Sequence, residues 1–330
     1  MSKIKQTVKK ILSVMFGRPI AIHQDCVFIN QQSWEDFDAA DFYSVSNPRN
    51  LEIVCGNPLL IRKQDYSKIV AYIGNIEPPM LRRLCNLKWF QLASHGYNGF
   101  DRADLYGETR PIVSNLRNVF SNPMSDFCIA SFYYFHSYSL RNLSKRKVCC
   151  SDLQVLPAQV SVMIIGLGNI GMVLAQKCKQ LGWSVIGVKQ KIAGFEQPNY
   201  VDQVLSFEEI NESLKCVDFV VNLLPEKEDT KGIYTYEFFK KMKSSAIFCN
   251  VGRGTAVNDL DIDRAVSEGV IAGAVLDASV SKKYKSKNII VTKHTSYVSA
   301  ENRHKLNQYY RSQLMKFLSG DAIENTISIK

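Results

Sequence analysis

A glycine-rich turn in the middle of the chain has the spacing of a phosphate-binding loop. Gly166, Gly168 and Gly171 stand in the order G-x-G-x-x-G, with Asn169 and Ile170 between the last two, directly after a short apolar run. The first glycine would make a tight turn, the second would let the backbone approach a pyrophosphate, and the third would let a helix pack on the strand. The helix N-terminus would then point at the phosphates. The pattern predicts a dinucleotide site, and a strand–helix turn without a ligand is the alternative.

The next strand along the chain ends in basic rather than acidic residues. An Asp or Glu about 20 residues beyond the glycines would bind the ribose 2′-hydroxyl of NAD. The sequence instead has Lys189, Gln190 and Lys191 at this position. Because lysines can neutralise a 2′-phosphate, we predict NAD(P) as the cofactor, with NADPH favoured. The alternative is that both lysines are solvated charges at a strand end.

Apolar runs alternate with helical segments around this turn. Runs typical of buried parallel strands lie at 161–165, 183–188, 217–224, 246–251, 273–278 and 288–292. Helical segments lie at about 207–214, 235–243 and 258–268. This alternation predicts an α/β fold, here a doubly wound parallel sheet.

The flanking regions show a second α/β pattern. A strand at 69–74, a helix at 78–85 and a strand at 88–92 indicate a further parallel domain. Other segments are predicted as a helix at 122–143, a linker at 144–159, a helix at 299–318 and a tail at 321–329. Residues 1–16 have helical spacing with interleaved lysines. We expect a helix that packs on its own domain, with a membrane-surface or partner helix as the alternative.

Composition and charge exclude several classes of protein. The chain has 330 residues, 46% hydrophobic and 22% charged, which is ordinary for a globular protein, and it has no transmembrane-length apolar run. The net charge of +10 is spread along the chain, so we expect small anionic ligands and no nucleic acid. The nine cysteines are scattered without a C-x-x-C, which favours reduced, buried thiols in a cytoplasmic protein and no metal site.

Several motifs occur in an order that resembles the D-isomer-specific 2-hydroxyacid dehydrogenase family. They are the glycine turn at 166–171, Leu224-Pro225 with Thr230, the run N-V-G-R-G at 250–254, the run A-G-A-V-L-D at 272–277, and T-K-H-T at 292–295. The match is dense over about 160–297, and it is weaker over 69–145 and in the last helix. Residues 1–68 match poorly.

This resemblance implies a two-domain oxidoreductase that reduces a 2-oxo acid to a D-2-hydroxy acid with NAD(P)H. Residues 121–297 would form the NAD(P)-binding Rossmann domain. That domain would be inserted into a smaller, flavodoxin-like substrate domain made of residues 1–120 and 298–330. Substrate would bind in the cleft between the domains, and a homodimer would form through the cofactor domain.

The resemblance also assigns roles to individual residues. Arg253 matches the substrate-binding arginine, whose planar guanidinium can hold a carboxylate bidentately and polarise the neighbouring carbonyl. His294 matches the catalytic histidine, which can give a proton to the carbonyl oxygen. Asp277 matches a residue near the nicotinamide carboxamide. The remaining matches are Ser94, His95 and Gly96 for the substrate carboxylate, and Leu224, Pro225, Thr230, Val251 and Gly252 for the cofactor.

One departure from the family pattern bears on catalysis. The family has a Glu shortly after the Leu-Asp pair, whereas residues 278–285 contain no acid and include Lys282, Lys283 and Lys285. A carboxylate next to an imidazolium favours its charged form. Without it, we expect slow or acid-shifted reduction of a 2-oxo acid. The alternative is an impaired homologue that binds NAD(P) as a sensor or binding partner.

Overall fold

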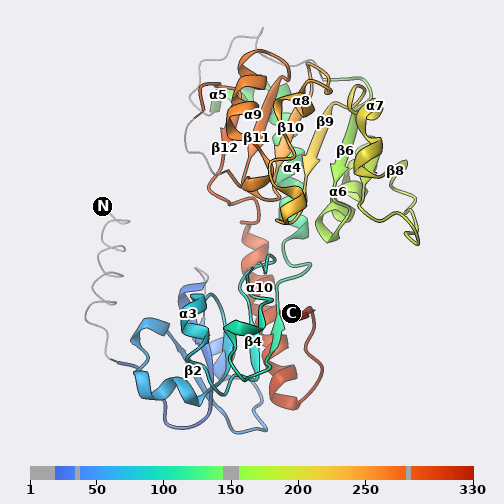
Figure 1. Cartoon of the computed structure of the whole chain (residues 1–330). Helices are drawn as coiled ribbons and strands as arrows, with labels where there is room; N and C mark the ends of the chain where they lie inside the picture. The colour runs from blue at the N-terminus through green and yellow to red at the C-terminus, as the bar shows by residue number, and fades with distance from the viewer. Residues whose placement is uncertain (1–18, 34–37, 98, 144–155, 280–283) are drawn as a thin grey trace. The chain divides into compact units, whose positions relative to one another are not determined.

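The computed structural model describes residues 19–33, 38–97, 99–143, 156–279 and 284–330. The chain divides into two compact units (Figure 1). Unit 1 comprises residues 1–119 and 300–330, and unit 2 comprises residues 120–299. The helix predicted at 1–16, Lys282 and Lys283, and most of the predicted linker lie outside the described residues.

Unit 1 is built on a sheet with the strand order β2-β1-β3-β4-β5-β13. Its strands are β1 (Cys26–Asn30), β2 (Glu52–Gly56), β3 (Ile69–Ile73), β4 (Trp89–Gln91), β5 (Ile112–Ser114) and β13 (Thr326–Ile327). The first five are parallel, in the 2-1-3-4-5 order of flavodoxin-like folds, and β13 pairs antiparallel with β5. All side chains of β1 and β3 are buried, as expected for strands covered on both faces.

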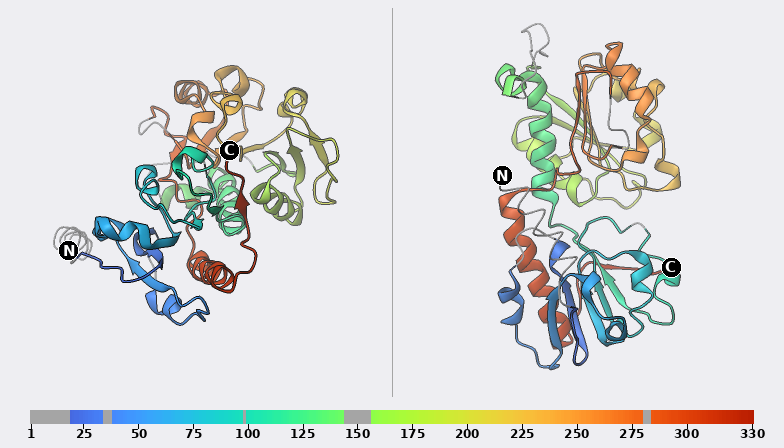
Figure 2. Two further views of the ribbon diagram at one scale, coloured as in Figure 1. Left: turned by 60° about the horizontal axis from the view of Figure 1, so that its bottom comes forward. Right: turned by 90° about the vertical axis from the view of Figure 1, so that its left-hand side faces the viewer.

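Helices and short 3-10 turns cover this sheet. They are α2 (Ala39–Tyr43), α3 (Pro78–Leu81), α10 (Ala300–Ser319), η1 (Gln31–Ser33), η2 (Pro58–Leu60), η3 (Lys63–Lys68) and η4 (Ala103–Leu105). α10 runs along the sheet (Figure 2). Its Phe317 stacks on Trp89 of β4 at a centroid distance of 5.2 Å. The predicted tail at 321–329 was wrong, because Thr326–Ile327 form an edge strand. The helix predicted at 78–85 is shorter in the structure, where α3 ends at Leu81.

Unit 2 contains a fully parallel sheet in the order β12-β11-β10-β9-β6-β7-β8. Its strands are β6 (Ser161–Ile165), β7 (Ser184–Val188), β8 (Gln203–Leu205), β9 (Phe219–Asn222), β10 (Ile247–Asn250), β11 (Gly273–Leu276) and β12 (Ile289–Val291). The strand order reverses between β6 and β9, which is where doubly wound sheets bind their ligands. Together, the sheets of the two units confirm the predicted fold class.

The helices of unit 2 pack on both faces of this sheet. They are α4 (Ser121–His136), α5 (Tyr138–Leu143), α6 (Asn169–Gln180), α7 (Asn211–Leu214), α8 (Tyr236–Phe239), α9 (Asp259–Ser267), η6 (Phe207–Glu209), η7 (Glu228–Thr230) and η8 (Gly254–Ala256). α4 contacts the sheet through Phe132, whose ring centroid lies 5.3 Å from that of Phe219 on β9. The single helix predicted at 122–143 is two helices, because Ser137 has extended backbone angles, φ −114° and ψ 114°.

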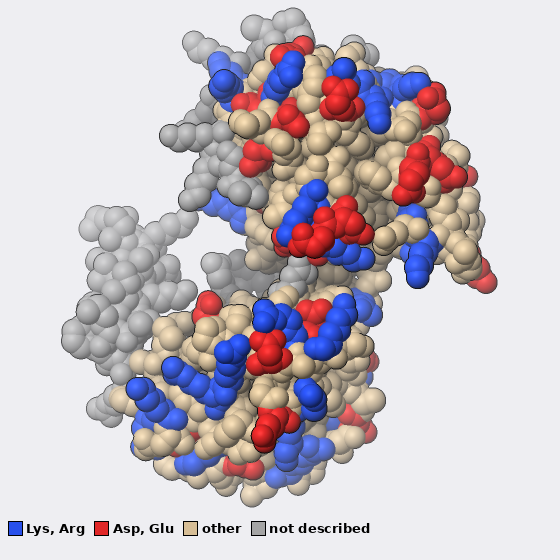
Figure 3. Space-filling view, viewed as in Figure 1, with Lys and Arg blue, Asp and Glu red and all other residues tan. Residues whose placement is uncertain are grey.

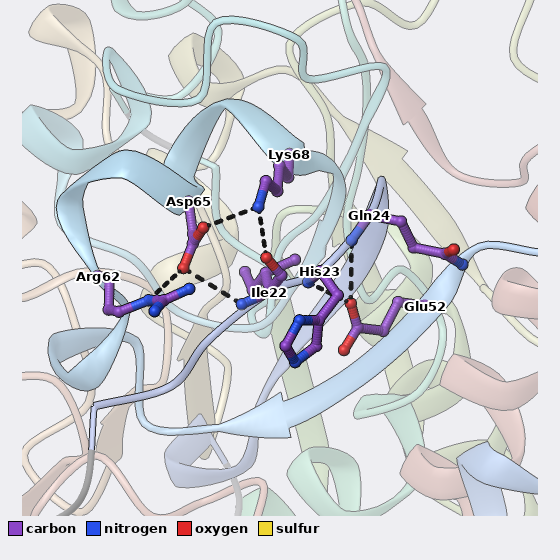
Figure 4. Close-up of polar contacts among 7 residues, drawn as sticks. All are labelled: Ile22, His23, Gln24, Glu52, Arg62, Asp65 and Lys68. Atoms are coloured by element: carbon purple, nitrogen blue, oxygen red, sulfur yellow. Dashed lines mark hydrogen bonds and ion pairs between the residues drawn. The ribbon is translucent and has the colours of Figure 1, made fainter.

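A buried carboxylate links the segment before β1 to η3 (Figure 4). Asp65 accepts hydrogen bonds from Arg62 Nε at 2.7 Å, Lys68 Nζ at 3.0 Å and the backbone N–H of Ile22 at 3.2 Å. Burial by itself would raise the pKa of Asp65, but these bonds outweigh it and lower the pKa to about 2. Nearby, Glu52 accepts the backbone N–H of His23 at 2.8 Å. Charged groups therefore fix the chain that enters β1.

Basic and acidic side chains are intermixed over the face of the molecule in Figure 3. No helix within the described ranges is both long enough and apolar enough to cross a membrane. The same ranges contain no group of three His, Cys, Asp or Glu that could hold a metal ion. The cysteine expectation was wrong at Cys85 and Cys216, which are exposed, whereas Cys26, Cys128, Cys178 and Cys249 are buried and free.

Candidate active site

The predicted residues of unit 2 follow the carboxyl ends of six strands of one sheet. The glycine turn follows β6, Lys189 and Gln190 follow β7, Leu224 to Thr230 follow β9, Val251 to Arg253 follow β10, Asp277 follows β11, and His294 follows β12. Because all these strands are parallel, their carboxyl ends lie on the same edge of the sheet. The fold thus brings these residues to one edge, and Ser94, His95 and Gly96 follow β4 in unit 1.

The geometry of the glycine turn fits a bound pyrophosphate. Gly166 has φ +113°, and a Cβ on Gly171 would lie 2.2 Å from the Gly166 carbonyl oxygen, so neither position accepts a side chain. A Cβ on Gly168 would meet nothing within 4 Å. Gly168 is the N-cap of α6, and no side chain caps that helix. The turn therefore leaves an open, uncapped helix N-terminus, with Asn169 and Ile170 in its first turn.

The end of β7 is basic and is tied to the loop after β9. Lys189 Nζ lies 4.7 Å from the ring centroid of Phe195, and Gln190 Nε2 donates to Asp229 at 3.3 Å. Thr230 closes the same loop, because its hydroxyl accepts from the Lys227 N–H and donates to the Pro225 carbonyl, each at 2.9 Å. Thr230 thus shapes the Pro225 loop from within.

Two buried asparagines fix the turn that carries Arg253. Asn222 Nδ2 donates to Asn250 Oδ1 at 2.8 Å, and Asn250 Nδ2 donates to the Arg253 carbonyl at 3.1 Å. Tyr234 donates to Asn222 Oδ1 at 2.9 Å, and burial raises the pKa of Tyr234, which keeps this donor protonated. A Cβ on Gly252 would lie 2.7 Å from the Leu224 carbonyl oxygen, so this turn packs directly on the end of β9.

Asp277 fastens the loop that carries His294. Its carboxylate is 1% exposed and accepts four hydrogen bonds, from Thr292 Oγ1 at 2.6 Å, the N–H of Thr295 at 2.7 Å, and the N–H and Oγ of Ser296 at 3.1 and 2.5 Å. Its carbonyl also accepts the His294 N–H at 3.0 Å. The carboxylate that the family resemblance placed near the cofactor thus binds mainly to the loop that carries His294.

The imidazole of His294 is exposed and faces an aromatic pair. Its backbone has φ +55°, a left-handed conformation that is uncommon outside glycine. The ring lies 6.4 Å edge-on from that of Tyr297, which in turn packs on Phe120 at 5.1 Å. Among the described residues, the imidazole has no hydrogen-bond partner. Tyr284, the first described residue after the 280–283 gap, bonds to Asp259 and Ser279 instead.

The substrate-loop candidates lie together in unit 1. Ser94 Oγ donates to the Gly96 carbonyl at 2.5 Å, and the Ser94 carbonyl accepts the Leu116 N–H at 3.0 Å. Asn115 Nδ2 donates to the His95 carbonyl at 2.6 Å. The sequence analysis missed this asparagine and Asn222, and it included Asn250 in a motif without giving it a role. A polar residue that closes an apolar strand is the signal that could have identified all three.

This combination defines a class of protein before any comparison is made. A doubly wound parallel sheet with an open glycine turn at its switch point binds dinucleotides. A basic and an imidazole side chain, Arg253 and His294, follow the two strands that flank β11 in this sheet. Such an arrangement is that of a dinucleotide-dependent oxidoreductase.

Comparison with known proteins identifies the family. The family model described as D-isomer specific 2-hydroxyacid dehydrogenase, NAD binding domain, matches residues 143–299. A probable 2-ketogluconate reductase of Dictyostelium discoideum is 30% identical over 283 residues, which cover 79% of this chain and 81% of that protein. The chain therefore belongs to the D-isomer specific 2-hydroxyacid dehydrogenase family, a family of oxidoreductases, as its sequence motifs predicted.

Further relatives and a solved structure agree with this assignment. A glyoxylate reductase/hydroxypyruvate reductase of Mus musculus is 28% identical over 182 residues, which cover 52% of this chain and 54% of that enzyme. A D-isomer specific 2-hydroxyacid dehydrogenase family protein from Aeromonas salmonicida has a similar fold, with a TM-score of 0.70 and 23% identity. That alignment covers 93% of this chain and 100% of the bacterial one.

Proposed function

We propose that this protein reduces a small 2-oxo acid to the D-2-hydroxy acid with NAD(P)H. The observation that carries the proposal is the sheet edge around β11. Arg253 and His294 follow the strands on either side of β11, and Asp277, which follows β11 itself, fastens the His294 loop. The relatives named as glyoxylate, hydroxypyruvate and 2-ketogluconate reductases support this reaction class.

Unit 2 would bind the cofactor. The open N-terminus of α6, with Gly166, Gly168 and Gly171, would receive the pyrophosphate through backbone N–H groups. Leu224, Pro225, Thr230, Val251 and Gly252 lie on the loops that follow β9 and β10 on the same edge and would line the rest of the site. When bound, the dihydronicotinamide supplies the hydride that reduces the substrate's carbonyl carbon.

The side chains of this chain would bind the substrate and supply the proton. Arg253 would hold the substrate carboxylate through two parallel N–H···O bonds and draw electron density from the adjacent carbonyl. The imidazolium of His294 would donate its proton to the carbonyl oxygen as the carbon is reduced, so that the product is a neutral hydroxyl group. Ser94, His95 and Gly96 of unit 1 would contribute backbone N–H groups to carboxylate binding.

NADPH is the proposed preference. Lys189 is held over Phe195, which limits the freedom of its ammonium group, and Lys191 is exposed two residues later. Both could neutralise a 2′-phosphate. Because the Asp229 carboxylate next to Gln190 opposes further negative charge, we expect a modest preference, about tenfold in Kd.

Residues 121–297 are proposed as the cofactor domain, and residues 1–120 with 298–330 as the substrate domain. A homodimer in the cytoplasm, with no nucleic-acid partner, completes the proposal. The N-terminal segment, whose membrane contact the sequence left open, lies outside the described residues.

Steady-state oxidation of NADPH and NADH with glyoxylate, hydroxypyruvate and larger 2-oxo acids tests the reaction. We expect turnover with at least one of these acids. Arg253→Lys should raise KM at least tenfold, because an ammonium cannot form the planar fork. His294→Gln should lower kcat at least 100-fold, within the usual range for loss of a general acid.

Cofactor titrations provide the control for these variants. Arg253→Lys and His294→Gln should bind NADPH as the wild type does, and Lys189→Ala should weaken NADPH binding but not NADH binding. Tighter binding of NADH by the wild type would contradict the cofactor preference. Tight NADPH binding without turnover on any 2-oxo acid would contradict the reaction and favour a binding role.

A further inference from the structure

We infer that Asn115, Tyr309 and Asn325 are positioning residues that brace the 94–96 loop from the C-terminal end of the chain. The inference rests on the proposed function, because that loop is its substrate-carboxylate loop. The three residues are far apart in the sequence, and all belong to unit 1. We call them the loop brace.

Asn115 is the member that touches the loop. Its Nδ2 donates to the His95 carbonyl at 2.6 Å, and the next residue, Leu116, donates its N–H to the Ser94 carbonyl at 3.0 Å. Two consecutive residues after β5 therefore bind two consecutive carbonyls of the loop. Peptide planes whose carbonyls are held in this way have their N–H groups fixed in direction, because each peptide unit is planar.

Tyr309 and Asn325 hold Asn115 in place. Tyr309 of α10 donates its hydroxyl to the Asn115 carbonyl at 3.0 Å, and the Asn325 carbonyl accepts the Asn115 N–H at 3.2 Å. Asn325 Nδ2 donates to the Tyr309 hydroxyl at 2.9 Å. Both backbone groups of Asn115 are thus bound by the C-terminal part of the chain.

At this buried position the side chain of Asn115 acts through its donor group. Asn115 is 2% exposed, and its Oδ1 is buried without a hydrogen-bond partner among the described residues. An unpaired buried acceptor destabilises the fold. The hydrogen bond from Nδ2 to the His95 carbonyl offsets the cost of burying Oδ1 without a partner. Asn325 has φ +53°, a conformation that asparagine tolerates better than other non-glycine residues.

The chain offers a matched control on the same helix. Gln313, one turn beyond Tyr309, is fully buried and binds Glu324, the neighbour of Asn325. Its Oε1 accepts the Glu324 N–H at 3.0 Å, and its Nε2 donates to Glu324 Oε2 at 3.3 Å. It ties α10 to the C-terminal segment as Tyr309 does, but it makes no bond to Asn115 or to the loop.

Hydrogen–deuterium exchange with kinetics tests the loop brace in the full-length chain. The variants are Tyr309→Phe, which removes only the hydroxyl, and Asn325→Ala, with Gln313→Ala as the control. Both brace variants should exchange the amides of Asn115 and Leu116, which donate to the Asn325 and Ser94 carbonyls, at least tenfold faster than the wild type. Both should also raise KM for the 2-oxo acid about tenfold and leave the Kd of NADPH unchanged, since the glycine turn lies in unit 2. Gln313→Ala should lower Tm without changing either loop property.

The two readouts separate the brace from the reaction. Exchange needs no turnover, so a wild type that reduces no 2-oxo acid would overturn the proposed function while exchange still decides the brace. Unchanged exchange at the Asn115 and Leu116 amides in both brace variants would overturn the inference. The same acceleration in Gln313→Ala would also overturn it, because any loosening of α10 would then suffice. Tyr309→Phe keeps the ring and its packing, and so remains informative if Asn325→Ala fails to fold.

Discussion

Asp277 illustrates how one buried carboxylate can organise a reactive loop. It directly follows β11, and its carboxylate oxygens accept hydrogen bonds from the 292–296 segment. Within that segment, His294 has a left-handed backbone conformation. Such a backbone conformation persists only where surrounding contacts impose it. The proton donor of the proposed reaction is thus positioned through its main chain, while its imidazole stays exposed.

Asp277→Asn should reduce activity more than stability. An amide keeps one acceptor oxygen and turns the other into a donor, which cannot accept the loop's N–H and hydroxyl groups. We expect kcat to fall at least tenfold, since small displacements of reacting groups have effects of this size. NADPH binding should change little. The measurements are kcat, Kd and Tm.

Asp218→Asn is the matched control for this prediction. Asp218 is also buried and accepts the N–H and hydroxyl of Ser161, each at 2.9 Å, but it lies at the start of β9, on the opposite edge of the sheet. It should lower Tm and leave kcat near the wild-type value. Equal losses of kcat in the two variants would contradict a specific role for Asp277.

At the scale of elements, the turn from β6 into α6 combines a structural and a binding requirement. Gly171 is needed by the fold, because any Cβ there meets the Gly166 carbonyl oxygen. Gly168 has φ −91° and open space around it, so the apo fold does not require a glycine. Only a bound ligand would require the second glycine.

Gly168→Ala and Gly171→Ala should therefore behave differently. Gly168→Ala should lower Tm by no more than about 4 °C, because alanine is less favourable than glycine at an N-cap by about 1 kcal/mol. It should weaken NADPH binding at least tenfold, because the methyl group occupies the space of the pyrophosphate. Gly171→Ala should destabilise unit 2 by about 1–3 kcal/mol. A Gly168→Ala protein with unchanged NADPH affinity would identify the turn as purely structural.

The η3 segment gives a prediction about acid stability. The pKa of Asp65 is about 2 when folded, against an ordinary value of 3.8, so its contribution is present above pH 4 and is lost as pH falls toward 2. Asp65→Asn should destabilise unit 1 by about 2 kcal/mol at pH 7, the scale of hydrogen bonds to a charged group. The difference in unfolding free energy between Asp65→Asn and the wild type should become smaller as pH falls from 4 to 2.

Urea midpoints followed by fluorescence in a Trp183→Phe background measure this effect, because the remaining tryptophans belong to unit 1. Asp104→Asn is the control, since Asp104 is half exposed and pairs with Arg82 and Arg102 at the surface. Such surface pairs contribute little, so we expect only a small shift of the urea midpoint. A difference in unfolding free energy between Asp65→Asn and the wild type that stays constant from pH 7 to pH 2 would contradict the role of Asp65.

At the scale of the whole molecule, each unit has a hydrophobic core of its own. One core is centred on residues such as Phe28, Tyr72 and Phe90, and the other on Met163, Tyr234 and Phe248. The second unit contains the glycine turn, Arg253 and His294, and the first contains the loop brace. Substitutions in the glycine turn and substitutions in the loop brace therefore fall in different units.

Assembly is the prediction that belongs to this scale. The proposed homodimer should have twice the 37.4 kDa mass of one chain in light scattering at micromolar concentration. The dimer should persist on dilution, since obligate dimer interfaces are large and apolar. Arg253→Lys, a site variant, should have the same mass and so serve as the control. A single monomeric mass at all concentrations would contradict the proposal.

Part of this molecule could be predicted from the sequence alone. The apolar runs before Gly166 and around 217–224 identified buried parallel strands, because strands covered on both faces need nearly continuous apolar residues. The glycine spacing and the ordered motifs identified the family, because backbone approach to a phosphate tolerates few residue types. These features are local, so the order of residues along the chain is enough to specify them.

The tertiary structure decided the rest. The sequence did not indicate that residues 326–327 pair with β5, that Asp277 binds the His294 loop, or that Tyr309 reaches Asn115 across 194 positions. Each of these depends on which strand ends and helix faces meet, and short polar segments carry no periodic pattern that specifies their partners. The sequence by itself determined the fold class and the family of this protein. Only the folded chain determined which side chains hold its two loops, because those contacts join residues far apart in the sequence.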